Sequence, residues 1–196
     1  MTLRVAVPTE DRILDLTEHL IQTRGFNGFS YADIASQLRI RNASIHYYFP
    51  TKTDLGRAVI DRYHQAFRRE LDLIDQRSTA PRKRLEQYVQ LYSDVLREKN
   101  RVCLCGMLAA DFTTLPKSIR DRVAAFFEDN ESWLVKVLEE GRKVRTLHFR
   151  GHPEVAARLV LSTLEGAMLV ARSYGDPARF ESVAAKLLTD FEARLK

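Results

Sequence analysis

The sequence has only two cysteines, Cys103 and Cys105, and a single residue separates them. This scarcity excludes the disulfide framework of small secreted domains. No run of about 18 apolar residues occurs, so no transmembrane helix and no membrane association are expected. The N-terminal stretch MTLRVAVPTEDR lacks the apolar core of a signal peptide. We therefore expect a cytoplasmic protein.

Sequence motifs of common catalytic and cofactor sites are also absent. The chain has no Gly-x-Ser-x-Gly nucleophile elbow, no phosphate-binding glycine loop and no His-Glu-x-x-His. The Cys-x-Cys pair supplies only two metal ligands, and His148 and His152 lie far along the chain in an unlike spacing. We therefore expect no catalysis, no cofactor and no metal.

The periodicity of apolar residues is helical almost everywhere. Of 196 residues, 45% are hydrophobic and 29% charged, which suits a folded domain with a core. No strand-like alternation appears. The predicted helices occupy 9–24, a short segment from Ser30, another from Asn42 to about Phe49, and a longer one from near Thr53 to a turn-like break at 76–84. Pro81 within that break suits a first helical position, and the next helix carries an apolar stripe from Leu85 to Leu96. The remaining predicted helices occupy 117–142, 153–173 and 177–195.

This pattern predicts an all-α protein with two parts. A three-helix helix-turn-helix domain would occupy residues 1–52. A larger helical bundle for ligand binding and dimerisation would occupy residues 53–196. Because the boundary falls at the start of a long helix, the two parts should be rigidly connected.

Charge is distributed unevenly along the chain. The net charge is +5 and the pI is about 9.3. Residues 1–75 hold ten basic and ten acidic side chains, so the excess lies in residues 76–196. A basic balance permits nucleic-acid binding without locating it. Locally, residues 39–57 set four basic side chains against Asp54 alone: Arg39, Arg41, Lys52 and Arg57.

The segment RNASIHYYFPTK, residues 41–52, is rich in side chains that can bind nucleic acid. Two short helices joined by a tight turn match a helix-turn-helix, whose second helix enters the major groove. Asn, Arg and Ser can bind base edges, while Tyr and Lys commonly bind phosphates. The alternative is that Tyr47 and Tyr48 are ordinary core residues. The predicted DNA contacts from this segment are Arg41, Asn42, Ser44, His46, Tyr47, Tyr48 and Lys52.

Residues 11–55, DRILDLTEHLIQTRGFNGFSYADIASQLRIRNASIHYYFPTKTDL, resemble the TetR family of bacterial transcription regulators. The resemblance rests on an ordered series: RIL at the start, RGF at the end of the first helix, DIA in the second and YYFPTKTDL closing the third. It implies DNA contacts at Arg41, Asn42, Ala43, His46, Tyr47, Tyr48 and Lys52, and a phosphate contact at Ser30 or Tyr31.

The chain departs from the family pattern in the turn. Arg39 stands where the family usually has glycine, and Arg41-Asn42-Ala43 replaces the common Ser-Lys-Gly. His46 occupies the first tyrosine position. The fold is still implied, but the operator sequence is not.

The resemblance also implies a homodimer built from the last two helices, residues 153–195. Small residues such as Gly166 and Ala167 allow helices to approach closely. Residues 153–173 carry apolar side chains on more than one side, so one face can pack inside the monomer while another forms the interface.

A pocket for an unknown small-molecule effector is implied inside the bundle. Asn130 lies on an apolar stripe, and its amide requires a partner, either a ligand or a protein group. The aromatic and methionine positions are also typical of a plain core. The candidate lining residues are Tyr88, Tyr92, Leu96, Cys103, Met107, Phe112, Phe126, Asn130, Trp133, Leu134 and Met168.

The segment RVCLCGMLAADF, residues 101–112, resembles the GCLLGN-type segment of one branch of the family. Cys103 falls on the cysteine position of that branch, in which some members respond to electrophiles or oxidants and others bind small organic compounds. Arg101 and Lys99 could lower the thiol pKa. Alternatively, both cysteines are small buried apolar residues.

Together these features predict a ligand-responsive transcriptional regulator, and the family resemblance implies that it acts as a repressor. It would bind palindromic double-stranded operator DNA as a homodimer and be released by a small molecule, an electrophile or an oxidant. The alternative is a DNA-binding protein of the same fold that is controlled by a protein partner and takes no small-molecule ligand.

Overall fold

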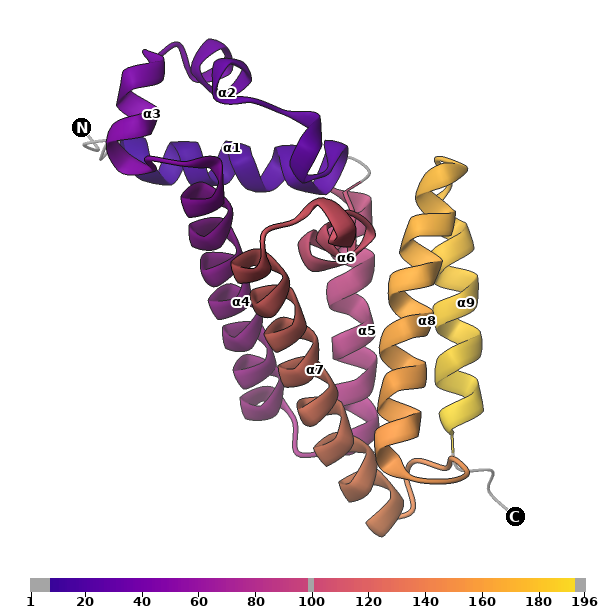
Figure 1. The fold of residues 1–196 in the computed structure, drawn as a ribbon. Helices are drawn as coiled ribbons and strands as arrows, with labels where there is room; N and C mark the ends of the chain where they lie inside the picture. The colour runs from indigo at the N-terminus through magenta and orange to yellow at the C-terminus, as the bar shows by residue number, and fades with distance from the viewer. Residues whose placement is uncertain (1–7, 99–100, 193–196) are drawn as a thin grey trace, which may run out of the picture.

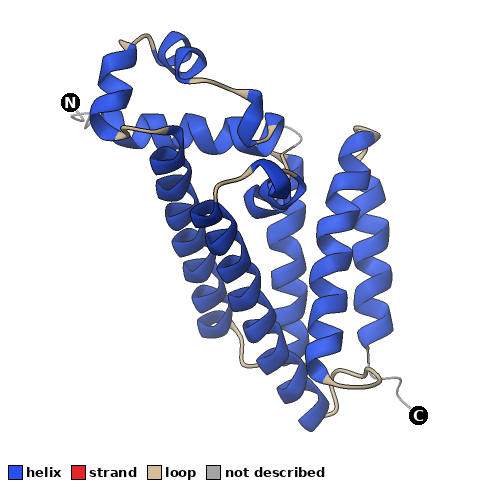
Figure 2. Ribbon diagram, viewed as in Figure 1, coloured by secondary structure: helices blue, strands red, loops and turns tan. Residues whose placement is uncertain are grey.

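The computed structural model describes residues 8–98 and 101–192, and these form helices joined by short loops (Figure 2). The only β-type pairing among them is one bridge between Leu147 and Glu192. The all-α prediction is confirmed. The elements are α1 (Thr9–Arg24), η1 (Phe26–Gly28), α2 (Tyr31–Leu38), α3 (Asn42–Tyr48), α4 (Lys52–Arg77), α5 (Pro81–Arg97), α6 (Leu104–Ala110), η2 (Phe112–Thr114), α7 (Lys117–Lys143), α8 (Pro153–Ser173) and α9 (Pro177–Phe191).

Local sequence signals explain where several helices begin. Ser30 and Asp33 form a capping box before α2, with Asp in the place of the usual Glu or Gln. Thr51 and Asp54 form a second box before α4. Proline occupies the first position of α5, α8 and α9, where its missing N–H costs no helical hydrogen bond.

The helices form a head and a bundle (Figure 1). Helices α1–α3 make the head, and α4 runs from the head along one side of the bundle. Helices α8 and α9 lie side by side on the opposite side, packed against α7 and α5. The short α6 lies beneath α1, so it touches the head and the bundle at once.

Buried apolar side chains connect both parts into one core. In the head, Ile13, Ile34 and Ile45 are fully buried, and in the bundle Tyr88 and Phe126 are. α6 was not among the predicted helices, and it brings Cys105 into this core. Within the described residues, no helix is both long and apolar enough to cross a membrane.

Candidate DNA-reading surface and effector site

Helix α3 turns one face inward and presents the other to solvent. Ile45 and the following Phe49 are buried and anchor the helix in the head. Tyr47 is 82% exposed and Tyr48 38% exposed, and their rings meet edge to face with centroids 5.2 Å apart. A core role for Tyr47 is therefore excluded. Arg41, Asn42, Ala43 and His46 are exposed and Ser44 is half-buried.

The turn between α2 and α3 has a backbone that favours glycine. Arg39 adopts a left-handed conformation with φ of 55°, which is uncommon for residues other than Gly, Asn and Asp. This geometry explains why glycine is usual here in the family pattern. Two hydrogen bonds hold the turn: Ile40 N donates to Ala35 O at 3.0 Å, and Arg12 Nη2 donates to Leu38 O at 3.2 Å.

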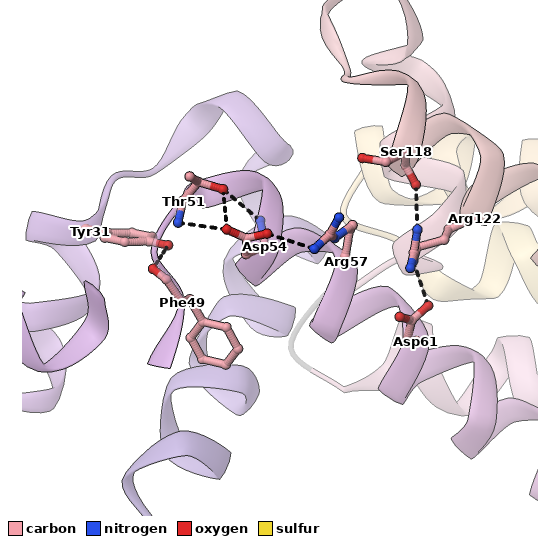
Figure 3. Close-up of polar contacts among 8 residues, drawn as sticks. All are labelled: Tyr31, Phe49, Thr51, Asp54, Arg57, Asp61, Ser118 and Arg122. Carbon is pink, nitrogen blue, oxygen red and sulfur yellow. Dashed lines mark hydrogen bonds and ion pairs between the residues drawn. The ribbon is translucent and has the colours of Figure 1, made fainter. Parts of the chain in front are cut away.

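Three of the predicted phosphate contacts have partners inside the head. Ser30 Oγ donates to Asp33 Oδ2 at 2.6 Å. The Tyr31 hydroxyl donates to Phe49 O at 2.8 Å, and burial raises the pKa of Tyr31 to about 12 (Figure 3). Lys52 Nζ donates to Phe29 O at 2.5 Å, and burial lowers its pKa.

His46 and Lys52 each pack against an aromatic ring of the head. The His46 ring lies 4.7 Å from the Tyr31 ring, and its Nδ1 is 3.2 Å from Pro50 O. Lys52 Nζ lies 4.2 Å from the centre of the Phe29 ring, a cation–π distance. Arg41, Asn42 and Tyr47 are exposed on the outward face of α3.

Polar contacts join the head to the bundle at the middle and at the C-terminal end of α1. Arg62 of α4 pairs with Asp15 at 2.8 Å and with Glu18 at 3.3 Å, in the middle of α1. At the C-terminal end, Arg172 of α8 donates to the carbonyls of Gln22 and Thr23 at 3.2 and 2.5 Å.

The segment after α6 forms a further connection to the head. Asp111 Oδ2 accepts a hydrogen bond from Phe26 N at 2.8 Å. Gly25 has φ of 76°, and a Cβ on it would lie 2.9 Å from the same oxygen. Both the conformation and the close approach therefore require glycine at the end of α1.

A hydrogen-bonded ion pair also joins helix α4 to α7. Arg122 donates to Asp61 Oδ1 at 2.8 Å and to Ser118 O at 3.1 Å, as Figure 3 shows. In the same view Asp54 caps the start of α4 and accepts from Arg57 at 2.8 Å. A shift of α7 or α6 would therefore displace α4, which follows α3 in the chain, and α1, which packs against α3.

The interior of the bundle contains a cavity of about 10 Å³, which is room for about one water molecule. Three predicted pocket residues line it: Tyr92, Cys103 and Met168. The other lining residues were not predicted, because they read as ordinary apolar positions of α4 and α5: Tyr63, Phe67, Leu91 and Val95.

The remaining predicted pocket residues lie elsewhere. Asn130 is satisfied by protein, since its Nδ2 donates to Phe126 O at 2.8 Å and its Oδ1 accepts from the Tyr88 hydroxyl at 3.0 Å. Phe112 is 54% exposed on η2, so it does not line the interior cavity. Trp133 stacks on Tyr88 and donates to Asp75, Met107 contacts Arg172, and Leu96, Phe126 and Leu134 are buried in the core.

The two cysteines are free and buried. Burial raises the pKa of both thiols well above the ordinary value, and the nearby Glu165 carboxylate raises it further. The expectation that Arg101 lowers the thiol pKa is therefore wrong: Arg101 pairs with Glu98 at 3.2 Å, and burial dominates. Lys99 lies outside the described residues.

A stripe of small and apolar residues runs along the outer side of α8. Its members recur at three- and four-residue spacing and face away from the core. Leu159 is 56% exposed, and a Cβ on Gly166 would meet nothing within 4 Å. The stripe consists of Val155, Leu159, Ser162, Gly166 and Val170. Three of these residues, Ser162, Gly166 and Val170, border a surface groove of about 420 Å³ together with Val183 of α9.

Comparison with known proteins agrees with this architecture. The family described as bacterial regulatory proteins, tetR family, matches residues 13–59, and a tetracyclin repressor-like C-terminal domain matches residues 81–187. The chain belongs to the TetR family of transcriptional regulators.

Particular relatives match over most of the chain. The HTH-type transcriptional repressor NemR of Escherichia coli strain K12 is 25% identical over 167 residues, 84% of each chain. A TetR-family regulator from Agrobacterium tumefaciens is 33% identical with a TM-score of 0.91, over 94% of this chain and 97% of that one. A TetR regulator from Legionella pneumophila is 34% identical with a TM-score of 0.87, over 95% and 98%.

Proposed function

We propose that the chain is a cytoplasmic, ligand-responsive transcriptional repressor that binds palindromic operator DNA as a homodimer. The observation that supports it most is the outward face of α3, where Arg41, Asn42 and Tyr47 are exposed around the buried anchor Ile45. Arg41, Asn42, Ala43 and Ser44 would meet base edges in the major groove. His46, Tyr47, Tyr48, Ser30, Tyr31 and Lys52 would hold sugar and phosphate.

The outer stripe of α8 supports the dimer. Exposed Val155, Leu159 and Val170 would be removed from water when α8 and α9 of two protomers pack together, and Gly166 would let the helices come close. Burial of such apolar surface is favourable by about 25 cal/mol per Å². A two-fold dimer presents two α3 helices and therefore requires a palindromic operator.

Control would pass through α6 and α8. Both helices border the bundle interior, and both contact the end of α1 through Asp111 and Arg172. A ligand that favours one position of these helices would change the separation of the two α3 helices. Release of DNA then requires that the ligand bind the non-reading arrangement more tightly than the reading one.

The geometry favours a reversible ligand over an electrophile or oxidant. The reactive form of cysteine is the thiolate, and burial of Cys103 beside Glu165 disfavours it. A second candidate is control by a protein partner without a small ligand, and the small size of the cavity favours it.

Selection from a random DNA pool tests the DNA reading, and gel shift on the recovered DNA tests the control. We expect a palindrome, a complex of two protomers, and release by a small molecule. An electrophile, applied with a reductant control, should release DNA weakly and slowly. Recovery of no common sequence would contradict the proposal. Release by the electrophile that is lost in Cys103→Ser would replace the reversible ligand with cysteine sensing.

A further inference from the structure

Glu165 of α8 is a carboxylate placed inside the bundle. It lies one helical turn before Met168, which lines the cavity. Its carboxyl group interacts with the Tyr92 hydroxyl and the Cys103 thiol, which line the same cavity. A Cβ on Gly106 would lie 2.3 Å from Glu165 Oε2, so α6 carries glycine where the carboxylate needs space.

One oxygen of this half-buried side chain lacks a hydrogen-bond partner. Glu165 Oε1 is buried and accepts no hydrogen bond from any described residue. Burial raises the pKa of Glu165 to about 7, against smaller lowering effects of Cys103 and Tyr92. A buried carboxylate oxygen without a donor destabilises a fold, and a cation that also donates a hydrogen bond would relieve that cost.

The wall beside the carboxylate suits a cation that carries an apolar group. Tyr63, Phe67 and Tyr92 line the cavity with rings, and ring faces attract cations. Leu91, Val95 and Met168 supply the apolar remainder. The Glu165 carboxylate would repel an anion, and a neutral compound would leave the charge of Glu165 without a counter-charge.

We propose that Glu165 is the anchor of the effector site and that the effector is a protonated amine with an apolar substituent. The ammonium N–H would donate to Glu165 Oε1, and the substituent would lie among the rings of α4 and α5. The small cavity must widen to admit this ligand. Widening would move α6 at Gly106, and with it Asp111, which holds the backbone just after the end of α1. The inference rests on the proposed function, because it names the ligand class for that repressor.

Four compounds of similar shape test the ligand class on the wild-type protein at pH 8. They are 2-phenylethylamine, neutral 2-phenylethanol, anionic 3-phenylpropanoate and trimethyl(2-phenylethyl)ammonium, which has the charge but no N–H donor. Calorimetric titration measures their binding, and gel shift measures release of the selected operator. We expect the amine to bind at least about tenfold more tightly than the other three and to release the DNA.

Two variants on α8 assign the effect to one carboxylate. Glu165→Gln keeps the shape without the charge and should weaken amine binding at least about tenfold. Glu154→Gln removes an exposed carboxylate of the same helix and should bind the amine like the wild type. If Glu165→Gln fails to fold, the four-compound series on the wild type decides alone.

Equal binding of the alcohol and the amine, or no amine binding, would overturn the proposal. So would undiminished amine binding by Glu165→Gln. If the protein still binds its operator and another compound releases it, only the ligand class has failed. Failure to bind any operator would instead remove the proposed function.

Discussion

Tyrosine is used in opposite ways on the outward face of α3 and in the interior of the bundle. Tyr47 on α3 is 82% exposed. Tyr88 and Tyr92 on α5 are buried, with their hydroxyls 3.1 Å apart, and Tyr88 also donates to Asn130 Oδ1 at 3.0 Å. A ring with a polar tip is therefore not a functional signal in itself. What distinguishes the two regions is whether protein already satisfies the tip.

The largest expected effect is on the stability of the bundle. Tyr88→Ala removes a fully buried ring and should lower the free energy of unfolding by about 3–5 kcal/mol. Tyr88→Phe keeps the ring but leaves Asn130 Oδ1 without its donor, which should cost about 1–3 kcal/mol. Urea denaturation measures both. A Phe variant as stable as the wild type would show that the buried hydroxyl is not needed.

The pH dependence of the free energy of unfolding isolates the contribution of Glu165 to the stability of the bundle. Its folded-state pKa of about 7 lies above the ordinary 4.5, so the folded protein holds this proton more tightly than the unfolded chain. The resulting stability is full below about pH 4.5 and is lost as pH rises through about 7. Between pH 4.5 and 8, the wild type should lose on the order of 2–3 kcal/mol relative to Glu165→Gln.

Denaturation of the wild type, Glu165→Gln and Glu154→Gln across that range measures this difference. The exposed Glu154 should show no comparable loss against its own variant. A constant difference between wild type and Glu165→Gln at all pH values would contradict the raised pKa.

The exposed tyrosine should show the reverse behaviour to Tyr88. Tyr47→Ala should weaken operator binding by roughly tenfold to a hundredfold, because it removes the contact to the DNA backbone that we propose for this side chain. Its free energy of unfolding should change by less than about 0.5 kcal/mol, as for other surface substitutions. Gel-shift titration and urea denaturation of the same preparation test both. Unchanged DNA affinity would remove Tyr47 from the reading face.

Lys52 has a partner inside the protein, like Tyr88, and a proposed contact to DNA, like Tyr47. Its substitution should therefore have the smallest effect, divided between stability and DNA binding. Lys52→Met keeps the apolar stem but removes the ammonium from Phe29 O, which should cost about 1 kcal/mol of stability. If the ammonium also meets a phosphate, the slope of log affinity against log salt should fall by about one. A lower stability with an unchanged slope would assign Lys52 to the head's structure alone.

Most helix positions could be predicted because their signals are local. The capping box at Ser30 and the prolines at 81, 153 and 177 set helix starts without help from distant residues. Helix α6 was missed because its seven residues, LCGMLAA, include no polar side chain. Without polar positions the sequence shows no helical alternation of apolar and polar residues, and Leu104, Cys105 and Leu108 are all buried.

The site was predictable on the head and much less so in the bundle. Exposure of Tyr47 follows from its position on α3 opposite Ile45. The environment of Glu165 depends on Gly106 of α6 and Tyr92 of α5, which are far away in the sequence. The inward turn of Lys52 toward Phe29 O is likewise a tertiary contact. Helical periodicity carries no information about contacts between residues that are distant in the sequence.

The central claim is that α3 reads a specific DNA sequence. The most direct measurement compares the affinity of the purified protein for its selected palindrome and for a scrambled duplex of the same composition, at physiological salt. The account predicts a preference of at least about a thousandfold for the palindrome. Equal affinity for both duplexes would contradict it, because phosphate contacts alone would then explain the binding.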